Sequence, residues 1–543
     1  MLCALPSLLA NGLLRFIDQR FVQPPGYYPL QSLVLLFAYL ALARVKSLER
    51  IRYLPPGEWG ALLGLDRIPE VKTVREKLDQ IADSAGTAAW ASDLSHFWME
   101  SDDTLAGVLY VDGHVRTYTG SQTELPRRFS SRDRLCLRSL IDYWVNDREG
   151  TPFFVVTAMG NEGMLHYLRH TIIPRLLEEV PRQPDASALA ADPTLHRFIM
   201  VFDREGWSPS FFCQLWHEHR IAILTYQRGS YDRWDTSDFH EVDVISVHGN
   251  HTTMRLAEKS YPVGKAITAA SPSARIREIR RLCDGSEHQT SIITTVQQGV
   301  MAKLAAYMFA RWSQENFFKY AERELSIDRL AGYAMAPAPE NQTIKNPEFV
   351  RLDNEIRRGR AQLVALQSER GRIPLSTGDT ADVAVHMERC APLDQQIITL
   401  TDELNQMRKR RRETRKRLAI KDIPEEKRPQ FIAPVRTQFL NTVRITAYRA
   451  ETAMVTILRK HLSRSDDGRA LLQDLFTHDA DLVTDRSAGT LTVRVHHFTN
   501  PQSTRAIQSL LLELNESETV YPGTRLAMRF EMVSVPTPVG QEV

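Results

Sequence analysis

Three acidic residues stand where carboxylates could bind a metal ion. Asp112 ends an apolar run that begins at Gly107, and Asp203 ends a second run that begins at Arg197. Glu315 lies midway along a segment with helical periodicity. Because strand ends of an open α/β sheet face the crevice where ligands bind, the three carboxylates could converge at one sheet edge. Oxygen ligands of this kind suit Mg²⁺ or Mn²⁺.

Clustered carboxylates that hold two divalent ions are typical of phosphoryl transfer. One ion activates water or a 3′-hydroxyl, and the other stabilises the leaving oxygen. Taken singly, each carboxylate also has a structural interpretation. Asp112 precedes Gly113 and could belong to a turn, and Asp203 precedes Arg204 and could form a surface ion pair. The three together favour a catalytic site.

Two cations flank Glu315 on the same helix. Arg311 and Lys319 lie four residues to either side, so all three side chains share one helix face. Cations beside a metal-binding carboxylate suit a phosphate substrate. The alternative is a ladder of salt bridges worth about 0.3 to 0.5 kcal/mol per pair. The many aromatic residues of this segment indicate burial, where unpaired charges are costly, and this favours a functional role.

The sequence around these residues resembles the DDE transposases of bacterial insertion sequences, in the group with a β-strand insertion before the catalytic Glu. The resemblance covers about residues 60 to 335 and rests on three motifs: Val111-Asp112-Gly113-His114, the segment from Val201 to Trp207, and the segment from Arg311 to Phe318. It implies a ribonuclease-H-like domain. It also implies catalytic and metal-binding roles for Asp112, Asp203 and Glu315, with two Mg²⁺ (or Mn²⁺) ions as cofactors.

The same resemblance implies cut-and-paste transposition, with cleavage at the element ends and strand transfer into target DNA. The partners would be double-stranded DNA, as terminal inverted repeats and target, and a second copy in a homodimer. The place of action would be the bacterial cytoplasm, at the nucleoid. The implied DNA contacts from this region are His114, Arg204, Arg311, Lys319 and Trp234. Trp234 could stack on a flipped base, or it could be an ordinary core tryptophan.

Two other functions compete with transposition. One is a catalytically inactive DNA-binding derivative, which the intact set of three carboxylates argues against. The other is a different ribonuclease-H-like, metal-dependent nuclease, since similar carboxylates serve many phosphoryl-transfer enzymes. A β-strand insertion and a basic helical hairpin argue against the second alternative.

Residues 1–104 have the pattern of a helical N-terminal domain. Within it, Val71, Val74, Leu78 and Ile81 recur on one face of a short helix. Lys72 and Arg75 lie off that face and could contact DNA. The alternative is a solvated helix packed on its neighbours.

Residues 105–335 alternate strands and helices in the manner of an α/β catalytic domain, interrupted at 227–295 by an antiparallel β insertion with a turn at Asp284-Gly285. After this insertion, Thr295 is expected to cap one helix that runs from Val300 to about Leu325. Residues 431–543 read as an α+β C-terminal region for dimerisation or end binding.

Residues 340–430 carry two heptad runs, which predict an antiparallel coiled-coil hairpin with Gly359 as a weak point. The segment from Arg408 to Arg417 holds eight basic residues in ten, among them Arg408, Arg411 and Arg412. This basic segment could track a phosphate backbone or could be solvated surface.

The composition is that of an ordinary globular protein of 543 residues with a formal charge of +2, so a DNA-binding surface must come from local clustering. Five scattered cysteines without a C-x-x-C pair fit a reducing cytoplasm. The apolar run from Leu33 to Ala43 is shorter than the about 20 residues of a membrane span, so no membrane association is expected.

Overall fold

The computed structural model describes residues 1–118, 120, 125, 127–130, 133–158, 162–229, 231–246, 249–262, 275–283, 285–329, 335–337, 340, 343–374, 380–428, 430–432, 434–462, 464 and 467–533. The chain forms two compact units. The first unit joins Met1–Ala158, Gly163–Ala334 and Ala433–Val543, and the second joins Met159–Glu162 and Met335–Ile432. The predicted N-terminal, catalytic and C-terminal regions therefore belong to one unit.

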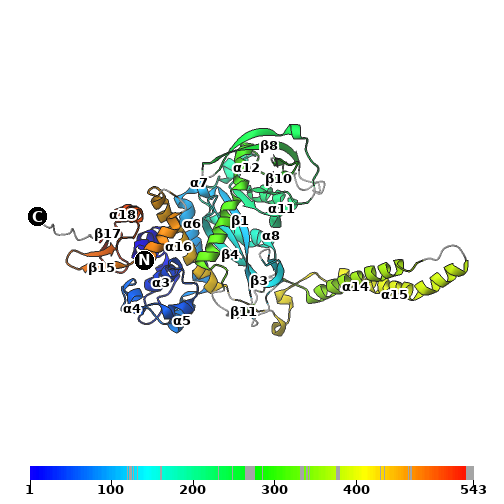
Figure 1. The fold of residues 1–543 in the computed structure, drawn as a ribbon, viewed down its shortest axis with the longest axis horizontal. Helices are drawn as coiled ribbons and strands as arrows, with labels where there is room; N and C mark the ends of the chain where they lie inside the picture. The colour runs from blue at the N-terminus through cyan, green and yellow to red at the C-terminus, as the bar shows by residue number, and fades with distance from the viewer. Residues whose placement is uncertain are drawn as a thin grey trace. The chain divides into compact units, whose positions relative to one another are not determined.

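A large mixed sheet forms the centre of the first unit (Figure 1). Its strand order is β2-β3-β1-β5-β6-β10-β9-β8-β7, with β4 on β3. The strands are β1 (Val108–Thr117), β2 (Arg127–Ser130), β3 (Leu135–Asn146), β4 (Pro152–Ala158), β5 (Ile199–Phe202), β6 (Ala222–Tyr226), β7 (His240–Ile245), β8 (His251–Pro262), β9 (Arg275–Leu282) and β10 (Gln289–Thr294). In this sheet, β5 pairs in parallel with both β1 and β6, and the other neighbours are antiparallel. All four side chains of β5 are buried, as expected of a central parallel strand.

The predicted mixed α/β architecture is found, but one strand boundary is wrong. Asp112 does not end its strand, because β1 continues to Thr117 while it pairs with β3. The parallel pairing with β5 does stop at Val111. Strands β7 to β10 form the expected antiparallel insertion. Of its predicted turn, Gly285 has a positive φ of 68°, which favours glycine, and Asp284 lies outside the described residues.

Helices flank the strands of this sheet. They are α1 (Leu5–Ala10), α2 (Ile17–Arg20), α3 (Leu30–Leu42), α4 (Pro56–Ala61), α5 (Val71–Ile81), α6 (Ser84–Ser101), α7 (Asp103–Ala106), α8 (Met164–Tyr167), α9 (Ile173–Glu179), α10 (Ala186–Ala191) and α11 (Pro209–Gln214). The long apolar run of the N-terminal region forms α3, which packs beside α16 (Val435–Arg459) (Figure 1). No helix among the described residues is long and apolar enough to cross a bilayer.

The single helix expected from Val300 to Leu325 is broken. Helix α12 (Met301–Phe309) ends at Ala310, α13 (Arg311–Tyr320) begins there, and a π-helical turn follows at Ala321–Leu325. Thr295 does not cap α12. Its hydroxyl instead accepts a hydrogen bond from the Ile223 amide at 3.0 Å, within the sheet.

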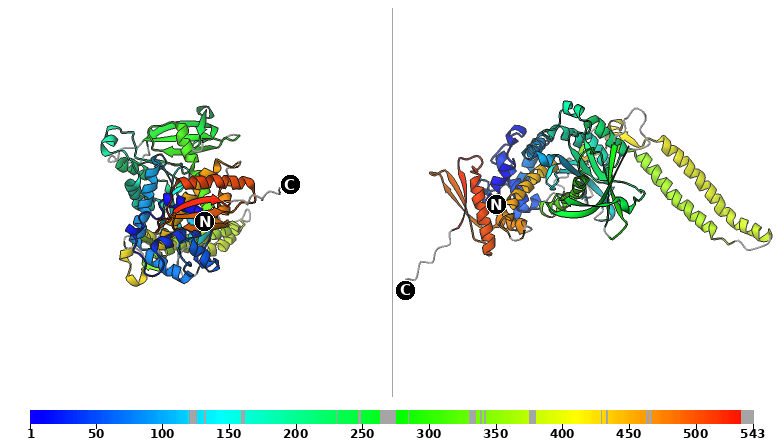
Figure 2. Two further views of the ribbon diagram at one scale, coloured as in Figure 1. Left: turned by 90° about the vertical axis from the view of Figure 1, so that its left-hand side faces the viewer. Right: turned by 90° about the horizontal axis from the view of Figure 1, so that it is seen from above.

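The second unit contains a helical hairpin. Its helices α14 (Pro347–Gly371) and α15 (Thr380–Glu413) run side by side in opposite directions (Figure 1 and Figure 2). Gly359 is not a weak point, because it is buried and faces Leu404, whose Cδ2 would lie 2.7 Å from a Cβ at this position. The sequence also predicts a polar break between the two heptad runs, around Pro374 to Asp382, of which residues 375–379 lie outside the described residues. Two antiparallel pairs complete the unit: β11 (Met335–Pro337) with β14 (Gln430–Ile432), and β12 (Thr343–Lys345) with β13 (Arg417–Ala419).

The C-terminal part of the first unit is α+β. It contains α17 (Gly468–Thr477), α18 (Pro501–Glu516) and a three-stranded sheet in the order β15 (Ala480–Asp485), β16 (Thr490–Val495), β17 (Ala527–Met532). Strand β15 was not expected from the sequence, because all six of its residues are exposed and no buried face imposes an alternating pattern.

Candidate active site

Asp112 and Asp203 lie at the same level of two adjacent strands. The parallel register of β1 and β5 pairs Val111 with Phe202, and each aspartate is the next residue in the chain after this pair. The chain then leaves the sheet after Phe202, where the Asp203 carboxylate accepts a hydrogen bond from the Glu205 amide at 2.8 Å. Two carboxylates from segments 91 residues apart are thereby held side by side.

Helix α13 brings Glu315 to the same place. Arg311, in its first turn, donates from Nη1 to Asp112 Oδ2 at 3.3 Å and from Nη2 to Glu315 Oε1 at 2.6 Å. The neighbouring Gln314 is buried and donates to Asn146 Oδ1 at 2.8 Å and to the Trp144 carbonyl at 3.2 Å. These contacts with β3 fix the helix against the sheet, so Glu315 projects toward Asp112.

The electrostatics of this site favour a bound cation. Burial and the nearby Asp203 carboxylate raise the pKa of Asp112 to about 7, and Glu315 adds to the rise. The Arg311 guanidinium and the Gly113 amide lower it. The Asp112 and Glu315 side chains are 18% and 29% exposed, so solvent and solutes can reach both. Further positive charge would relieve the mutual repulsion of the three carboxylates.

The donor atoms fit a hard divalent ion, although the carboxylates are not closed around one point. Among the described residues, no three His, Cys, Asp or Glu side chains are grouped closely enough to hold a metal ion. The Arg311 guanidinium bonds to both Asp112 and Glu315 and so lies between them. Carboxylate oxygens are the ligands that Mg²⁺ and Mn²⁺ prefer, and Asp112, Asp203 and Glu315 would supply them.

A family model described as "Transposase protein" matches residues 1–534 of this chain. The chain belongs to this transposase family. The match includes the N-terminal helices, the whole helical hairpin and the C-terminal sheet. No curated protein matches the chain. A transposase acts on DNA, so the surroundings of the other residues predicted to contact DNA bear on its function.

Arg204 and Lys319 are exposed, whereas His114 is not. The Arg204 guanidinium lies 5.8 Å from the centroid of the Tyr226 ring, and Lys319 Nζ lies 5.9 Å from that of the exposed Trp312. His114 is buried against Phe318, with ring centroids 5.4 Å apart, and burial lowers its pKa. In this arrangement, His114 packs α13 on β1, and a contact with DNA stays a prediction for this residue.

Trp234 of this transposase lies half-buried in the β insertion beneath two cations. Arg280 Cζ lies 4.1 Å and Lys259 Nζ 4.6 Å from its ring centroid. Gln289 bonds to the backbone amide and carbonyl of Trp234 and holds the segment in place. Stacking on a flipped base remains a prediction for this ring.

The predicted basic residues outside the sheet are partly paired. On α5, Lys72 is exposed and lies 3.9 Å from Glu76, and Arg75 pairs with Glu49. On α15, Arg411 donates to Asp353 of α14 at 2.5 Å, and Arg408 donates to Asn405 at 3.1 Å. Arg412 is exposed.

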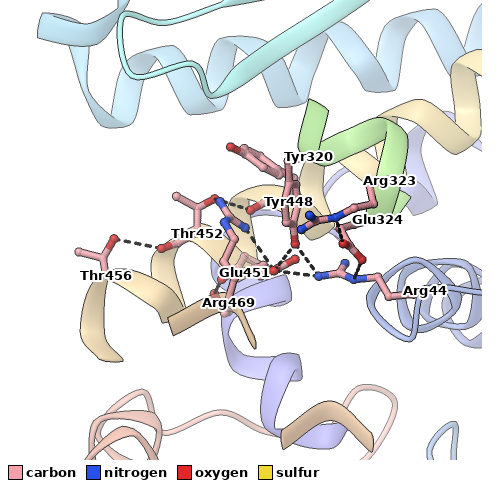
Figure 3. A network of polar contacts seen from close by, with 11 residues as sticks. Arg44, Tyr320, Arg323, Glu324, Tyr448, Glu451, Thr452, Thr456 and Arg469 are labelled. Carbon is pink, nitrogen blue, oxygen red and sulfur yellow. Dashed lines mark hydrogen bonds and ion pairs between the residues drawn. The ribbon is translucent and has the colours of Figure 1, made fainter. Parts of the chain in front are cut away.

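The sequence did not reveal a buried polar network at the end of α13. Figure 3 shows Glu451 of α16 with Arg44, Tyr320 and Arg469 around it. These residues are separated by 18 to more than 400 positions in the chain, and no local spacing relates them. The only sequence signal is a carboxylate on the largely buried helix α16.

Proposed function

We propose that this protein is a DDE-type transposase of a bacterial insertion sequence, which cleaves DNA at the element ends and joins them to target DNA. The observation that carries the proposal is the arrangement of the three carboxylates: Asp112 lies near Asp203, and Arg311 links Asp112 to Glu315. Membership of a transposase family supports DNA as the substrate. The two alternatives, a catalytically inactive derivative of a transposase and another ribonuclease-H-like, metal-dependent nuclease, are not favoured by the family match.

The order of the central strands supports a ribonuclease-H-like catalytic domain. Strands β4, β3 and β1 form an antiparallel meander, and β5 and β6 extend it in parallel. Asp112 and Asp203 then lie where the parallel pairing of β1 and β5 ends, and α13 supplies the third carboxylate from outside the sheet. The β7 to β10 insertion lies between the second and third acidic residues, as the resemblance implies.

The acidic and the basic residues of the site would have different roles in the reaction. Bound Mg²⁺ or Mn²⁺ ions would activate the attacking hydroxyl and stabilise the leaving oxygen. Asp112, Asp203 and Glu315 would hold the ions, and the pKa of Asp112, which burial and then the Asp203 carboxylate raise, indicates that this position disfavours an unpaired negative charge. Arg311 would grip the scissile phosphate through two parallel hydrogen bonds, and the exposed Lys319 and Arg204 would contact the flanking phosphates.

DNA binding and synapsis would involve further surfaces. Element ends and target DNA are both polyanions, and the exposed cations of α5 and of the basic segment Arg408 to Arg417 would contact their phosphates. Because a synaptic complex joins two element ends, we propose a homodimer as the active form.

Cleavage of a duplex that carries the element end tests this proposal. Asp112→Asn, Asp203→Asn and Glu315→Gln each keep the shape of the side chain and remove its charge. Each is expected to abolish Mg²⁺-dependent cleavage while DNA binding persists. Glu218→Gln, at an exposed carboxylate of the same unit, is the matched control and should cleave like the wild type. Wild-type cleavage in any of the three variants would remove that residue from the site, and a wild type that binds DNA without cleaving it would indicate an inactive derivative.

A further inference from the structure

Glu451 on α16 is a fully buried carboxylate with three polar partners. Its Oε1 accepts hydrogen bonds from Arg44 Nη2 at 2.9 Å and from the Tyr320 hydroxyl, and Arg469 Nη1 lies 3.2 Å away (Figure 3). These partners come from the end of α3, the end of α13 and the start of α17. Glu451 therefore joins four helical segments of the first unit at one oxygen atom.

Both carboxylates of this cluster are paired with cations. Arg44 also lies 3.3 Å from Glu324, which pairs with the exposed Arg323, so three guanidinium groups face two carboxylates (Figure 3). Removing one partner of a buried pair leaves an uncompensated charge, so the cluster has one favourable arrangement. Burial and the Glu451 carboxylate raise the pKa of Tyr320, which keeps its hydroxyl protonated as a donor.

Tyr320 is the last residue of α13, five positions after Glu315. Helix α13 has ten residues, is separated from α12 by the break at Ala310 and continues only as a π-helical turn at Ala321–Leu325. Its orientation is set by the Gln314 hydrogen bonds to β3 and by contacts at its two ends. Arg311 bonds to Asp112 at the first end, and Tyr320 bonds to Glu451 at the other.

We propose that Glu451 is a positioning residue for Glu315 and acts through the Tyr320 hydroxyl. This inference rests on the proposed function, in which Glu315 is catalytic. Catalytic groups must be held within about 0.5 Å and 10–20° of the productive geometry. A glutamate carboxylate projects about 6 Å from a helix axis, so a rotation of α13 by about 10° would move it by about 1 Å, beyond that tolerance.

Tyr320→Phe tests the proposal, because it removes one hydroxyl and keeps the ring. The ring retains its packing on Tyr448 and its contact with Arg469, whose Cζ lies 4.3 Å from the Tyr320 ring centroid. We expect single-turnover cleavage at saturating DNA to fall about tenfold. We also expect the Kd for Mn²⁺ alone, measured by calorimetry on the DNA-free protein, to rise severalfold, with the melting temperature within a few degrees of the wild type.

Tyr448→Phe is the matched control. It removes a hydroxyl from the same cluster and keeps the ring contact with Phe317. Among the described residues, that hydroxyl has no hydrogen bond to Glu451 or to α13, so cleavage and Mn²⁺ affinity should match the wild type. Equal losses in Tyr320→Phe and Tyr448→Phe would overturn the proposal, because they would indicate general loosening of the cluster. Wild-type cleavage and Mn²⁺ affinity in Tyr320→Phe would overturn it as well.

Glu451→Gln provides a second measurement in which the carboxylate shape is kept and the charge is lost. We expect a larger loss of cleavage than in Tyr320→Phe, together with a lower melting temperature, since Arg44 and Arg469 lose their shared counter-charge. Full activity in Glu451→Gln would also overturn the proposal. Glu315→Gln reports on the proposed function alone: if it retains cleavage, the catalytic role fails, whereas a silent Tyr320→Phe refutes only the positioning role.

Discussion

Arg311 and Asp112 are joined across 199 residues of sequence by a hydrogen bond of 3.3 Å between Nη1 and Oδ2. The same guanidinium also bonds to Glu315, so one cation ties α13 to β1 through both carboxylates. Arg311 therefore offsets part of the negative charge of the site in the metal-free protein. Divalent ions that bind to Asp112 and Glu315 must compete with this guanidinium, which would then become free to grip a phosphate.

Arg311→Gln should change metal binding and stability in opposite directions. Without the competing cation, we expect the Kd for Mn²⁺ to fall severalfold in the DNA-free protein, while the metal-free protein loses about 1 to 3 kcal/mol of unfolding free energy. Calorimetric titration and denaturant unfolding measure the two effects. A weaker Mn²⁺ affinity in Arg311→Gln would show that the guanidinium supports the metal site and does not compete with it.

Arg311→Lys tests whether Arg311 acts on the scissile phosphate through two parallel hydrogen bonds or only through its positive charge. An ammonium keeps the positive charge but cannot donate two parallel hydrogen bonds. We expect single-turnover cleavage to fall about tenfold with nearly normal melting temperature, and a milder loss in Lys319→Ala. Full activity in Arg311→Lys would contradict the phosphate grip.

Asp147 should make the protein less stable as the pH rises. It is buried beside Arg449, and burial raises its pKa to about 6. Because the folded pKa lies above the unfolded value, the folded protein binds the proton more tightly, and the stability from this group declines between about pH 4 and pH 6. The shift corresponds to about 3 kcal/mol. Asp147→Asn keeps an acceptor for the amides of Glu149 and Thr151 and removes the titration.

Unfolding of wild type and Asp147→Asn in urea at pH 4, 5, 6 and 7 measures this effect. The difference between the two proteins should shift in favour of Asp147→Asn as the pH rises and become constant above about pH 7. Other groups titrate equally in both proteins and cancel. A difference that does not depend on pH would mean that Asp147 is charged throughout the range.

The basic segment Arg408 to Arg417 should supply phosphate contacts only through its unpaired members. Arg411 pairs with Asp353, Arg410 lies 3.9 Å from Glu348, and Arg417 pairs with Glu162. Among the described residues, the exposed members without an ion pair are Lys409, Arg412, Arg415 and Lys416. Changing these four to Gln should weaken binding to all DNA sequences alike and reduce the slope of log K against log salt by about 0.9 per lost contact.

The matched control exchanges lysine and arginine at the same four positions and keeps the charge. It should leave the salt slope unchanged. A quadruple Gln variant with the wild-type slope would mean that this segment is solvated surface.

The local sequence pattern was sufficient to predict that Asp112 and Asp203 lie beside each other. An apolar run followed by an aspartate recurs at Asp112 and Asp203, and parallel pairing of two such runs brings their ends together. The break at Ala310 was not predictable, because no glycine or proline marks it in the sequence, and α12 and α13 pack on different strands only in the folded chain. The cluster around Glu451 was equally hidden, since its members meet only after the chain has folded.

Gly359 shows how packing can reverse an interpretation based on propensity. Glycine is about 1 kcal/mol less favourable than alanine within a helix, which made this position look weak. In the hairpin, however, the missing side chain lets Leu404 of α15 approach α14 closely.

Gly359→Leu should therefore destabilise the hairpin by about 1 to 3 kcal/mol, despite its better helix propensity, because Leu404 is buried and has little room to move. Adding Leu404→Ala should recover part of this loss, whereas Leu404→Ala alone should destabilise the wild type through the cavity that it leaves. Chemical unfolding of the four proteins gives the coupling energy. Additive losses would mean that Gly359 and Leu404 do not share the space between the helices.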